Sequence, residues 1–229
     1  MKLASFFSGG KDSTYAIYLA QKEGHKIECL LSIFTKSDES HLLHHPNLKW
    51  TKLQSKSMNI PQLTVNSNSD NTGDELILLE QLLQKAIDQY HIQGLVHGGI
   101  KSNFQKEKFE TLCLKLNLVC IAPLWNSEPK KYMNDLIDSN FNFIIISVSS
   151  DGLDDAWLGM PILKSDIDTL EHLSKKFGFN LNFEGGEAET FVINCPLFSN
   201  QIIIEEFRKE WNGYRGRFEI VDARLNYNA

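Results

Sequence analysis

The chain has 229 residues, of which 42% are hydrophobic and 23% are charged, and its formal net charge is −6. These values are typical of a globular protein with one domain or two small ones, and no apolar run is long enough to cross a bilayer. The acidic balance argues against a direct nucleic-acid partner, because such proteins need clustered Lys and Arg to neutralise phosphates.

Short apolar segments alternate with longer helical patterns through the first half of the chain. Strands are predicted at residues 3–7, 27–34, 63–65, 94–97 and 118–121. Helices are predicted at residues 13–23, 48–58, 75–90 and 107–116, with a polar loop at 66–73. This βαβα order predicts an α/β fold in which helices cover both faces of a parallel sheet.

The second half follows a different pattern. Helices are predicted at residues 129–138 and 165–177, and strands at 141–148, 202–205 and 218–224. This mixture is typical of a smaller α+β lobe. Polar residues gather before Pro129, and a proline restricts the residue that precedes it. We therefore predict two domains, residues 1–125 and residues 126–229.

The cysteines are Cys29, Cys113, Cys120 and Cys195. None belongs to a C-x-x-C pair, which argues against a structural zinc site or a dithiol redox site. We expect these thiols to be reduced and mostly buried, with Cys120 packed in the core. Because the N-terminus also lacks the pattern of a signal peptide, we expect a cytoplasmic protein without a membrane partner.

A glycine loop lies between the first predicted strand and the first predicted helix. It consists of Ser8, Gly9, Gly10, Lys11, Asp12 and Ser13. Its glycines let backbone amides converge on an anion, and the helix N-terminus that follows adds unpaired N–H groups. Lys11 supplies a full charge, and Asp12 supplies an oxygen ligand for Mg²⁺. A plain turn with a helix cap is the alternative, but the whole string favours pyrophosphate binding.

This loop differs from two common nucleotide-binding motifs. A Walker A loop has Gly where this chain has Ser5, and Ser or Thr where it has Asp12, and the dinucleotide motif G-x-G-x-x-G is absent too. The string resembles the signature of the N-type ATP pyrophosphatases, the PP-loop enzymes. That resemblance implies a fold like the adenine nucleotide alpha hydrolases (HUP-type), cleavage of ATP between its α and β phosphates, and catalytic roles for Lys11 and Asp12.

An acidic motif follows late in the chain, at residues 184–190. Its residues are Glu184, Gly185, Gly186, Glu187, Ala188, Glu189 and Thr190. The apolar residues 191–193 come directly after it and predict a strand. Several like charges at the edge of an apolar strand are unfavourable without a cation or a ligand. A solvated acidic turn is the alternative, but the context favours a binding role.

The glycine loop and the acidic motif together resemble the diphthine–ammonia ligases, a branch of the PP-loop enzymes. The resemblance also covers residues 39–40, 44–47, 98–105, 148–154 and 157–159, and so nearly the whole chain. This chain departs from the family pattern where Ala188 replaces a common aromatic residue, Phe104 a common Tyr, and Lys108 a common Arg. Without a ring, Ala188 offers no stacking surface.

The resemblance implies a ligase that amidates diphthine to diphthamide on translation elongation factor two. ATP and Mg²⁺ are the implied cofactors, and AMP and pyrophosphate are the implied products. Residues 1–125 would bind ATP and residues 126–229 the substrate. Free ammonium is the expected nitrogen source, because a chain of this length leaves no room for a glutaminase domain. The oligomeric state, a homodimer included, stays open.

Diphthine carries a trimethylammonium group, which negative charge and aromatic faces attract. We predict that Glu184, Glu187 and Glu189 supply the charge, and that Trp157 or Phe191 supplies the ring. Gly185, Gly186 and Thr190 belong to the same predicted substrate site. Carboxylates suit Mg²⁺ and ammonium equally well, so these two interpretations stay open.

Two further places are candidates for ligand contacts. His97 and Gly98 follow a predicted parallel strand, where open α/β sheets bind ligands, and a nucleotide contact is predicted there. A simple strand-end turn is the alternative. His44 and His45 precede Pro46. Adjacent residues point to opposite sides of an extended chain, so a nucleotide or substrate contact is favoured there over metal chelation.

Two other functions fit parts of this pattern. A PP-loop enzyme that modifies tRNA would share the glycine loop, but the net charge and the absence of a cysteine pair argue against it. A nucleotide-binding module without turnover would keep the fold, but the intact Lys11 and Asp12 argue against that. A shift assay with bulk tRNA tests the first alternative, and pyrophosphate release tests the second.

Overall fold

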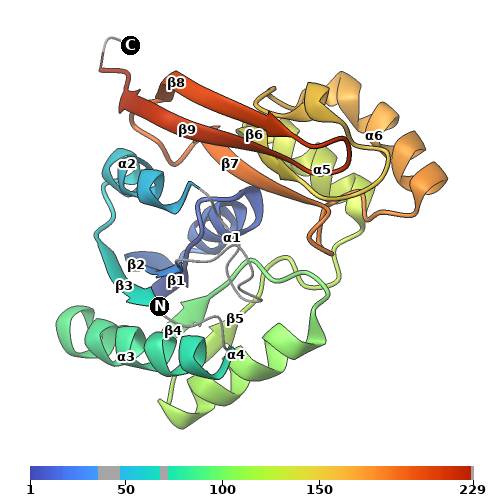
Figure 1. The fold of residues 1–229 in the computed structure, drawn as a ribbon. Coiled ribbons are helices and arrows are strands. Elements are labelled where there is room, and N and C mark those ends of the chain that lie inside the picture. The colour runs from blue at the N-terminus through green and yellow to red at the C-terminus, as the bar shows by residue number, and fades with distance from the viewer. Residues whose placement is uncertain (36–46, 68–71, 228–229) are drawn as a thin grey trace. The chain divides into compact units, whose positions relative to one another are not determined.

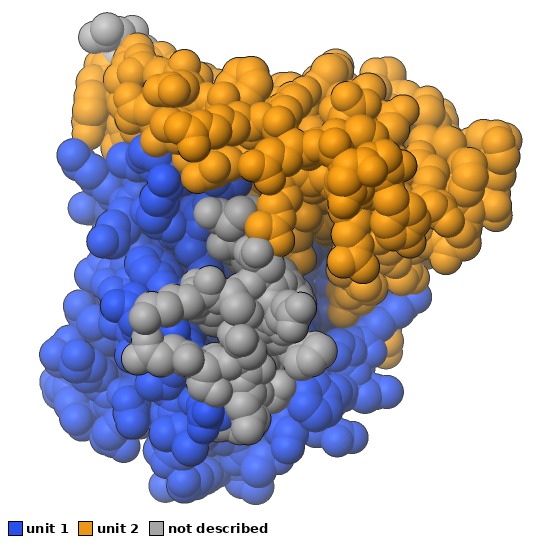
Figure 2. Space-filling model, viewed as in Figure 1, with its two compact units in different colours: residues 1–8, 12–125 blue, residues 9–11, 126–229 orange. Residues whose placement is uncertain are grey.

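The computed structural model describes residues 1–35, 47–67 and 72–227 (Figure 1). The predicted contacts at His44 and His45 lie outside the described residues, as do residues 39–40 of the family resemblance. The chain forms two compact units, one of residues 1–8 and 12–125 and the other of residues 9–11 and 126–229 (Figure 2). The middle of the glycine loop therefore belongs to the second unit.

A parallel five-stranded sheet is the centre of the first unit. Its strands are β1 (Lys2–Phe6), β2 (Lys26–Thr35), β3 (Gln62–Ser67), β4 (Gly94–Val96) and β5 (Val119–Ile121), in the spatial order β3-β2-β1-β4-β5. Every neighbouring pair is parallel. The strands are rich in Leu, Ile and Val, as expected when both faces of a sheet are covered. The predicted parallel sheet is confirmed.

Helices cover this sheet on both sides. They are α1 (Lys11–Lys22), α2 (Thr51–Met58) after the short η1 (Leu48–Trp50), α3 (Thr72–Tyr90) and α4 (Asn103–Lys115). Figure 1 shows α1 and α2 on the side opposite to α3 and α4. Helix α3 corresponds to the helix predicted at residues 75–90, and its apolar stripe packs in a core with Phe6 and Leu31 of the sheet and with Phe109 of α4. No helix among the described residues is long and apolar enough to cross a membrane.

Helix and strand ends differ from the prediction where polar residues cap an element. The predicted loop at residues 66–73 is partly wrong, because β3 runs to Ser67 and α3 begins at Thr72. Helix α4 begins at Asn103, before the predicted start at residue 107. Its cap is Ser102, whose Oγ accepts a hydrogen bond from the Gln105 N–H at 3.3 Å. Such a cap makes the first helical turn favourable although none of its residues is buried.

An antiparallel sheet is the centre of the second unit. Its strands are β6 (Asn142–Val148), β7 (Ala188–Asn194), β8 (Ile202–Trp211) and β9 (Gly216–Leu225), in the order β7-β6-β9-β8. All neighbouring pairs are antiparallel. The prediction ended the strand of β8 at residue 205, because charged residues follow there. They remain in the strand since β8 is an edge strand that is largely exposed from Glu205 onward.

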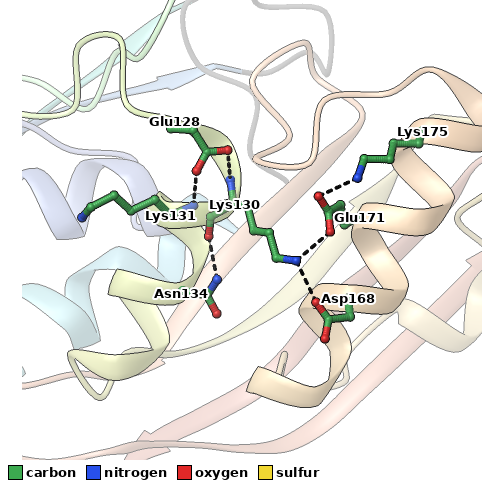
Figure 3. A network of polar contacts seen from close by, with 7 residues as sticks. All are labelled: Glu128, Lys130, Lys131, Asn134, Asp168, Glu171 and Lys175. Atoms are coloured by element: carbon green, nitrogen blue, oxygen red, sulfur yellow. Dashed lines mark hydrogen bonds and ion pairs between the residues drawn. The ribbon is translucent and has the colours of Figure 1, made fainter.

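Helices α5 (Pro129–Asp138) and α6 (Lys164–Phe177) complete this unit, together with the short η2 (Asp155–Trp157). Glu128 caps α5 by accepting hydrogen bonds from the N–H groups of Lys130 and Lys131. The ammonium of Lys130 joins α5 to α6 through Asp168 at 2.9 Å and Glu171 at 2.7 Å (Figure 3). Exposed pairs of this kind add little stability, and their geometry mainly sets how the helices face each other.

Candidate functional site

The candidate site residues of the first unit lie at the carboxyl ends of β1 and β4. These strands are neighbours, and the chain continues from β1 to β2 on one side and from β4 to β5 on the other. In open α/β sheets, ligands bind in the crevice at such a switch of direction. Ser8 follows β1, and His97 follows β4. The sequence therefore places the glycine loop and the predicted contact at Gly98 at the expected ligand end of one sheet.

Gly98 touches the backbone of the first turn of α1. A Cβ atom at this position would lie 2.5 Å from the carbonyl carbon of Asp12 and 2.6 Å from the nitrogen of Ser13. Both distances are shorter than any real contact, so only glycine fits here. The turn after β4 and the start of α1 thus approach each other closely at the backbone, beside the turn that carries Asp12.

Two serines at the ends of the glycine loop contact each other. The N–H of Ser8 donates to Oγ of Ser13 at 3.3 Å, and the two Oγ atoms are 3.1 Å apart. Gly9 has a φ of 81°, a left-handed conformation that glycine adopts without strain. The loop therefore leads directly into the N-terminus of α1, where backbone N–H groups and the helix dipole favour an anion such as a phosphate.

Lys11 is almost fully buried, with an exposed fraction of 1%. Its Nζ donates a hydrogen bond to the carbonyl oxygen of Asn182 at 2.7 Å. The ring centroids of Tyr132 and Phe183 lie 5.7 Å and 5.6 Å from Nζ. The backbone N–H of Lys11 donates to Oγ1 of Thr190 at 3.1 Å. A carbonyl and two aromatic faces therefore hold the ammonium in a fixed place, which the sequence did not indicate.

The acidic motif folds back on itself through Glu187. One carboxylate oxygen accepts hydrogen bonds from the N–H and the side-chain amide of Asn180, at 2.8 Å and 2.6 Å. The other oxygen accepts the N–H of Gly185 at 2.8 Å. The loop is fastened to the end of β6 as well, since Ser149 donates to the carbonyl of Gly186 at 2.6 Å. We call residues 180–187 the acidic loop. Within it, the Glu187 carboxylate accepts three N–H donors of its own loop.

The two glycines of the acidic motif meet different structural requirements. A Cβ atom at Gly185 would lie 2.7 Å from a carboxylate oxygen of Glu187, so a side chain there would push that carboxylate away. Gly186 has a φ of 80° and open space around it. The first glycine permits a close approach, and the second permits a left-handed turn.

The other residues of the motif begin β7. Glu189 pairs with Ser147 across the sheet and is partly exposed, while Ala188 is buried. Phe191 is 1% exposed, so its ring belongs to the core and cannot face a substrate. Of the two rings predicted for the substrate cation, Trp157 remains. It is the partly buried last residue of η2, and its neighbour Leu158 bridges to Ile145 of β6.

His97 turns its ring into the core of the first unit. The ring is 1% exposed, and its centroid lies 4.7 Å from that of Phe109. Nδ1 accepts the N–H of Gly99 at 3.1 Å, while Nε2 has no hydrogen-bond partner within the described part of the chain. His97 therefore shapes the turn at Gly98 from inside and offers almost no surface to a nucleotide.

Cys113 and Cys120 form a thiol pair beside this histidine. Cys113 lies in the last turn of α4 and Cys120 in β5, and both pack in the same core. A hydrogen bond from Cys113 lowers the pKa of the Cys120 thiol, and the nearby imidazole of His97 lowers it further. The same hydrogen bond raises the pKa of Cys113. Burial raises the pKa of both Cys29 and Cys195 to about 12.

Several residues of the site escaped the sequence interpretation. They are Tyr132, Ser149, Asn180, Asn182 and Phe183. Asn182 contributes a backbone carbonyl, which leaves no trace in a sequence. Phe183 has a φ of 60°, and this is strained for an aromatic residue. The only available signal was the position of Asn180 and Asn182 directly before the acidic motif.

Comparison with known proteins identifies the family. The profile of the diphthamide synthase N-terminal domain matches residues 1–120, and that of the diphthamide synthase C-terminal domain matches residues 128–225. The chain belongs to the diphthamide synthase family. Both profiles match in the expected order, so the family resemblance predicted from the glycine loop and the acidic motif is confirmed.

Curated relatives within the diphthamide synthase family support this assignment. The chain is 34% identical to the diphthine–ammonia ligase of Bos taurus over 223 residues, which cover 90% of this chain and 83% of that protein. It is 33% identical to the Homo sapiens protein of the same name, with the same coverage. The Saccharomyces cerevisiae relative is 26% identical, and the match covers 34% of its length. These relatives are ligases by name, which agrees with the predicted enzyme class.

Two solved structures are distant matches to this member of the diphthamide synthase family. A predicted subunit of a tRNA methyltransferase from Methanocaldococcus jannaschii has a TM-score of 0.42 and 17% identity, and the match covers 86% of this chain and 98% of that one. A tRNA thiolase from Methanococcus maripaludis has a TM-score of 0.39 and 13% identity, with 82% and 70% covered.

Proposed function

We propose that this member of the diphthamide synthase family amidates diphthine to diphthamide on translation elongation factor two. The proposed reaction consumes ATP and ammonium and releases AMP and pyrophosphate. The observation that supports it most strongly is the match to both domains of the family in one chain. The names of the mammalian relatives, which the chain covers over 83% of their length, support the choice of diphthine and ammonia.

The proposed reaction has two steps. A carboxylate oxygen of diphthine attacks the α phosphorus of ATP, and the bond to the β-phosphate oxygen breaks, which gives an acyl adenylate and pyrophosphate. The nitrogen of ammonia then attacks the acyl carbon, the bond to AMP breaks, and a proton leaves the nitrogen. The glycine loop at the switch of strand direction supports this scheme, because its N–H groups and the N-terminus of α1 suit the departing pyrophosphate.

Asp12 is the residue that we assign to Mg²⁺. Its carboxylate belongs to the first turn of α1, next to the N–H groups that suit the phosphates. Magnesium in nucleotide sites is commonly held by one or two carboxylates together with phosphate oxygens, and a single well-placed carboxylate fits that pattern. The bound ion would neutralise charge that develops on the phosphates. A cluster of protein ligands is not needed for this, and the described residues contain none.

In the second unit, Glu184 and Glu189 remain our candidates for the trimethylammonium group of diphthine, with Trp157 as the aromatic face. Glu189 is partly exposed at the start of β7, beside Thr190, which binds the backbone of Lys11. A quaternary ammonium has no N–H to donate, so negative charge at a distance and a ring suit it better than hydrogen bonds do.

The decisive experiment combines the purified protein with ATP, ammonium and elongation factor that carries diphthine. We expect AMP as the nucleotide product and a diphthine residue converted to its amide, measured by chromatography and by peptide mass spectrometry. ADP as the main product would refute adenylation. Turnover with glutamine but not with ammonium would refute free ammonium as the nitrogen source, and a gel shift with bulk tRNA would favour a tRNA-modifying enzyme.

A further inference from the structure

The ammonium of Lys11 sits in a cage that the acidic loop builds. The cage consists of the carbonyl oxygen of Asn182 and the rings of Phe183 and Tyr132. Two of these three residues belong to residues 180–187. Lys11, Asn182 and Phe183 are all buried. The position of the lysine ammonium therefore depends on how this loop is folded.

Two features of the acidic loop are unfavourable by themselves. The side-chain Nδ2 of Asn182 is buried and has no hydrogen-bond partner within the described residues. Phe183 has a φ of 60°, a left-handed conformation that is strained for an aromatic residue. A strained conformation persists only where the surroundings enforce it, so something else must hold the loop.

Glu187 holds both ends of the loop, in addition to the contact from Ser149. Its two carboxylate oxygens accept three N–H donors, two from Asn180 at the start of the loop and one from Gly185 near its end. The N–H of Phe183 also donates to the carbonyl of Asn180 at 2.8 Å, which closes a tight turn inside this bracket. The carboxylate thus brings both ends of the loop together around Asn182 and Phe183.

We propose that Glu187 is a positioning residue for Lys11: its carboxylate folds the acidic loop so that Asn182 and Phe183 hold the lysine ammonium in place. Glu187 touches neither ATP nor the protein substrate in this scheme and acts only through the loop. The catalytic consequence rests on the proposed function, in which Lys11 serves the departing pyrophosphate. The structural consequence, a caged lysine, does not depend on it.

The first test measures the cage without any turnover. Acetic anhydride acetylates accessible amines, and peptide mass spectrometry gives the rate at each lysine in the protein without ATP. We expect Lys11 to react far more slowly than Lys26, whose side chain is 73% exposed. Glu187→Gln keeps one acceptor oxygen but replaces the other with an amide that cannot accept the N–H of Gly185. Loss of one charge-assisted hydrogen bond should raise Lys11 acetylation about tenfold relative to Lys26.

Two variants make this test specific. Asn180→Ala removes the 2.6 Å hydrogen bond to Glu187 without changing any charge, so it should expose Lys11 as well. Glu205→Gln removes a carboxylate of the same unit that pairs with Arg224 on the surface, and it should leave Lys11 protected. Circular dichroism checks that each variant is folded. If Glu187→Gln is unfolded, Asn180→Ala carries the test alone. Unchanged protection of Lys11 in folded variants overturns the proposal.

Kinetics separate positioning from direct recognition of the substrate. A positioning role predicts that Glu187→Gln and Asn180→Ala lower kcat about tenfold and leave the KM for elongation factor unchanged, and that the double variant is no worse than the Glu187→Gln variant. A raised KM for elongation factor with Lys11 still protected would overturn the proposal and assign Glu187 to the substrate. If the acetylation results are as expected but the wild-type protein forms no amide, the proposed function is wrong. The positioning of Lys11 by Glu187 is then still supported.

Discussion

The two units fix their candidate site residues by opposite means. In the first unit, Gly98 lies against the backbone of Asp12 and Ser13, and the absence of a side chain creates the contact. In the second unit, the carboxylate of Glu187 reaches across a loop and gathers three N–H donors. Both regions contain a glycine pair in the sequence. Glycine pairs that look alike in sequence can therefore serve different purposes. One allows two backbone segments to pack closely, and the other leaves room for a carboxylate that holds a loop.

Lys11 lies in the cage that the acidic loop helps to build, and its loss should have the largest effect. Lys11→Ala should lower kcat about ten- to a thousand-fold, the usual range for the loss of one electrostatic stabiliser. AMP formation with saturating substrates measures this. Lys26→Ala, at an exposed position, is the control. A Lys11→Ala variant with full activity would show that the caged ammonium has no part in the reaction.

Gly98→Ala tests the backbone contact of the first unit. The added methyl group would meet Asp12 and Ser13, and this kind of overpacking destabilises a fold by about 1–3 kcal/mol. We also expect weaker binding of ATP, because the first turn of α1 must move. Gly24→Ala is the matched control, since Gly24 has a φ of 82° and nothing within 4 Å, so strain arises without a shift of the loop. Equal ATP affinity in both variants would contradict the expectation.

The glycine pair of the acidic motif offers a sharper comparison within one loop. Gly185→Ala would push on the carboxylate of Glu187 and should lower kcat as Glu187→Gln does, by about tenfold. Gly186→Ala meets open space and should cost only the left-handed strain, about 1–2 kcal/mol of stability. Thermal melts and kinetics of both variants separate the two effects. A larger loss of kcat in Gly186→Ala than in Gly185→Ala would show that the contact of the Glu187 carboxylate with its loop does not determine kcat.

The thiols of the first unit give a test by pH. Because the pKa of Cys120 is lowered, its thiolate should persist at mildly acidic pH and react with iodoacetamide at pH 6.5. Cys29 and Cys195, whose pKa values are about 12, should stay unmodified. Cys113→Ala removes the hydrogen bond that is the main cause and should slow alkylation of Cys120 about tenfold for each unit by which its pKa rises above the assay pH. An unchanged rate would refute the thiol pair.

The contrast between the two units also explains which features could be predicted from the sequence. The parallel sheet, the apolar stripe of α3 and the position of the glycine loop follow from the spacing of apolar residues and glycines, which are local properties. The cage around Lys11 depends on Asn182, a residue far along the chain that contributes only a carbonyl. The clamp of Glu187 was hidden for a different reason. A glutamate that binds its own loop and a glutamate that binds a ligand look the same in a sequence.

The smallest effect is expected at the surface of the second unit, between α5 and α6. Lys130, with Lys175 as the second cause, lowers the pKa of Glu171 to about 2 (Figure 3). A carboxylate with a depressed pKa stabilises the fold above its ordinary pKa near 4.5, and this contribution is lost as the pH falls toward 2. Lys130→Met should therefore lower Tm slightly at pH 7, and this difference from wild type should vanish by about pH 2, where the Glu171 carboxylate is protonated. Because the pair is exposed and screened by salt, the difference at pH 7 should also shrink in 1 M NaCl. A difference that persists in acid and in salt would mean that the stem of Lys130, and not its charge, holds the two helices together.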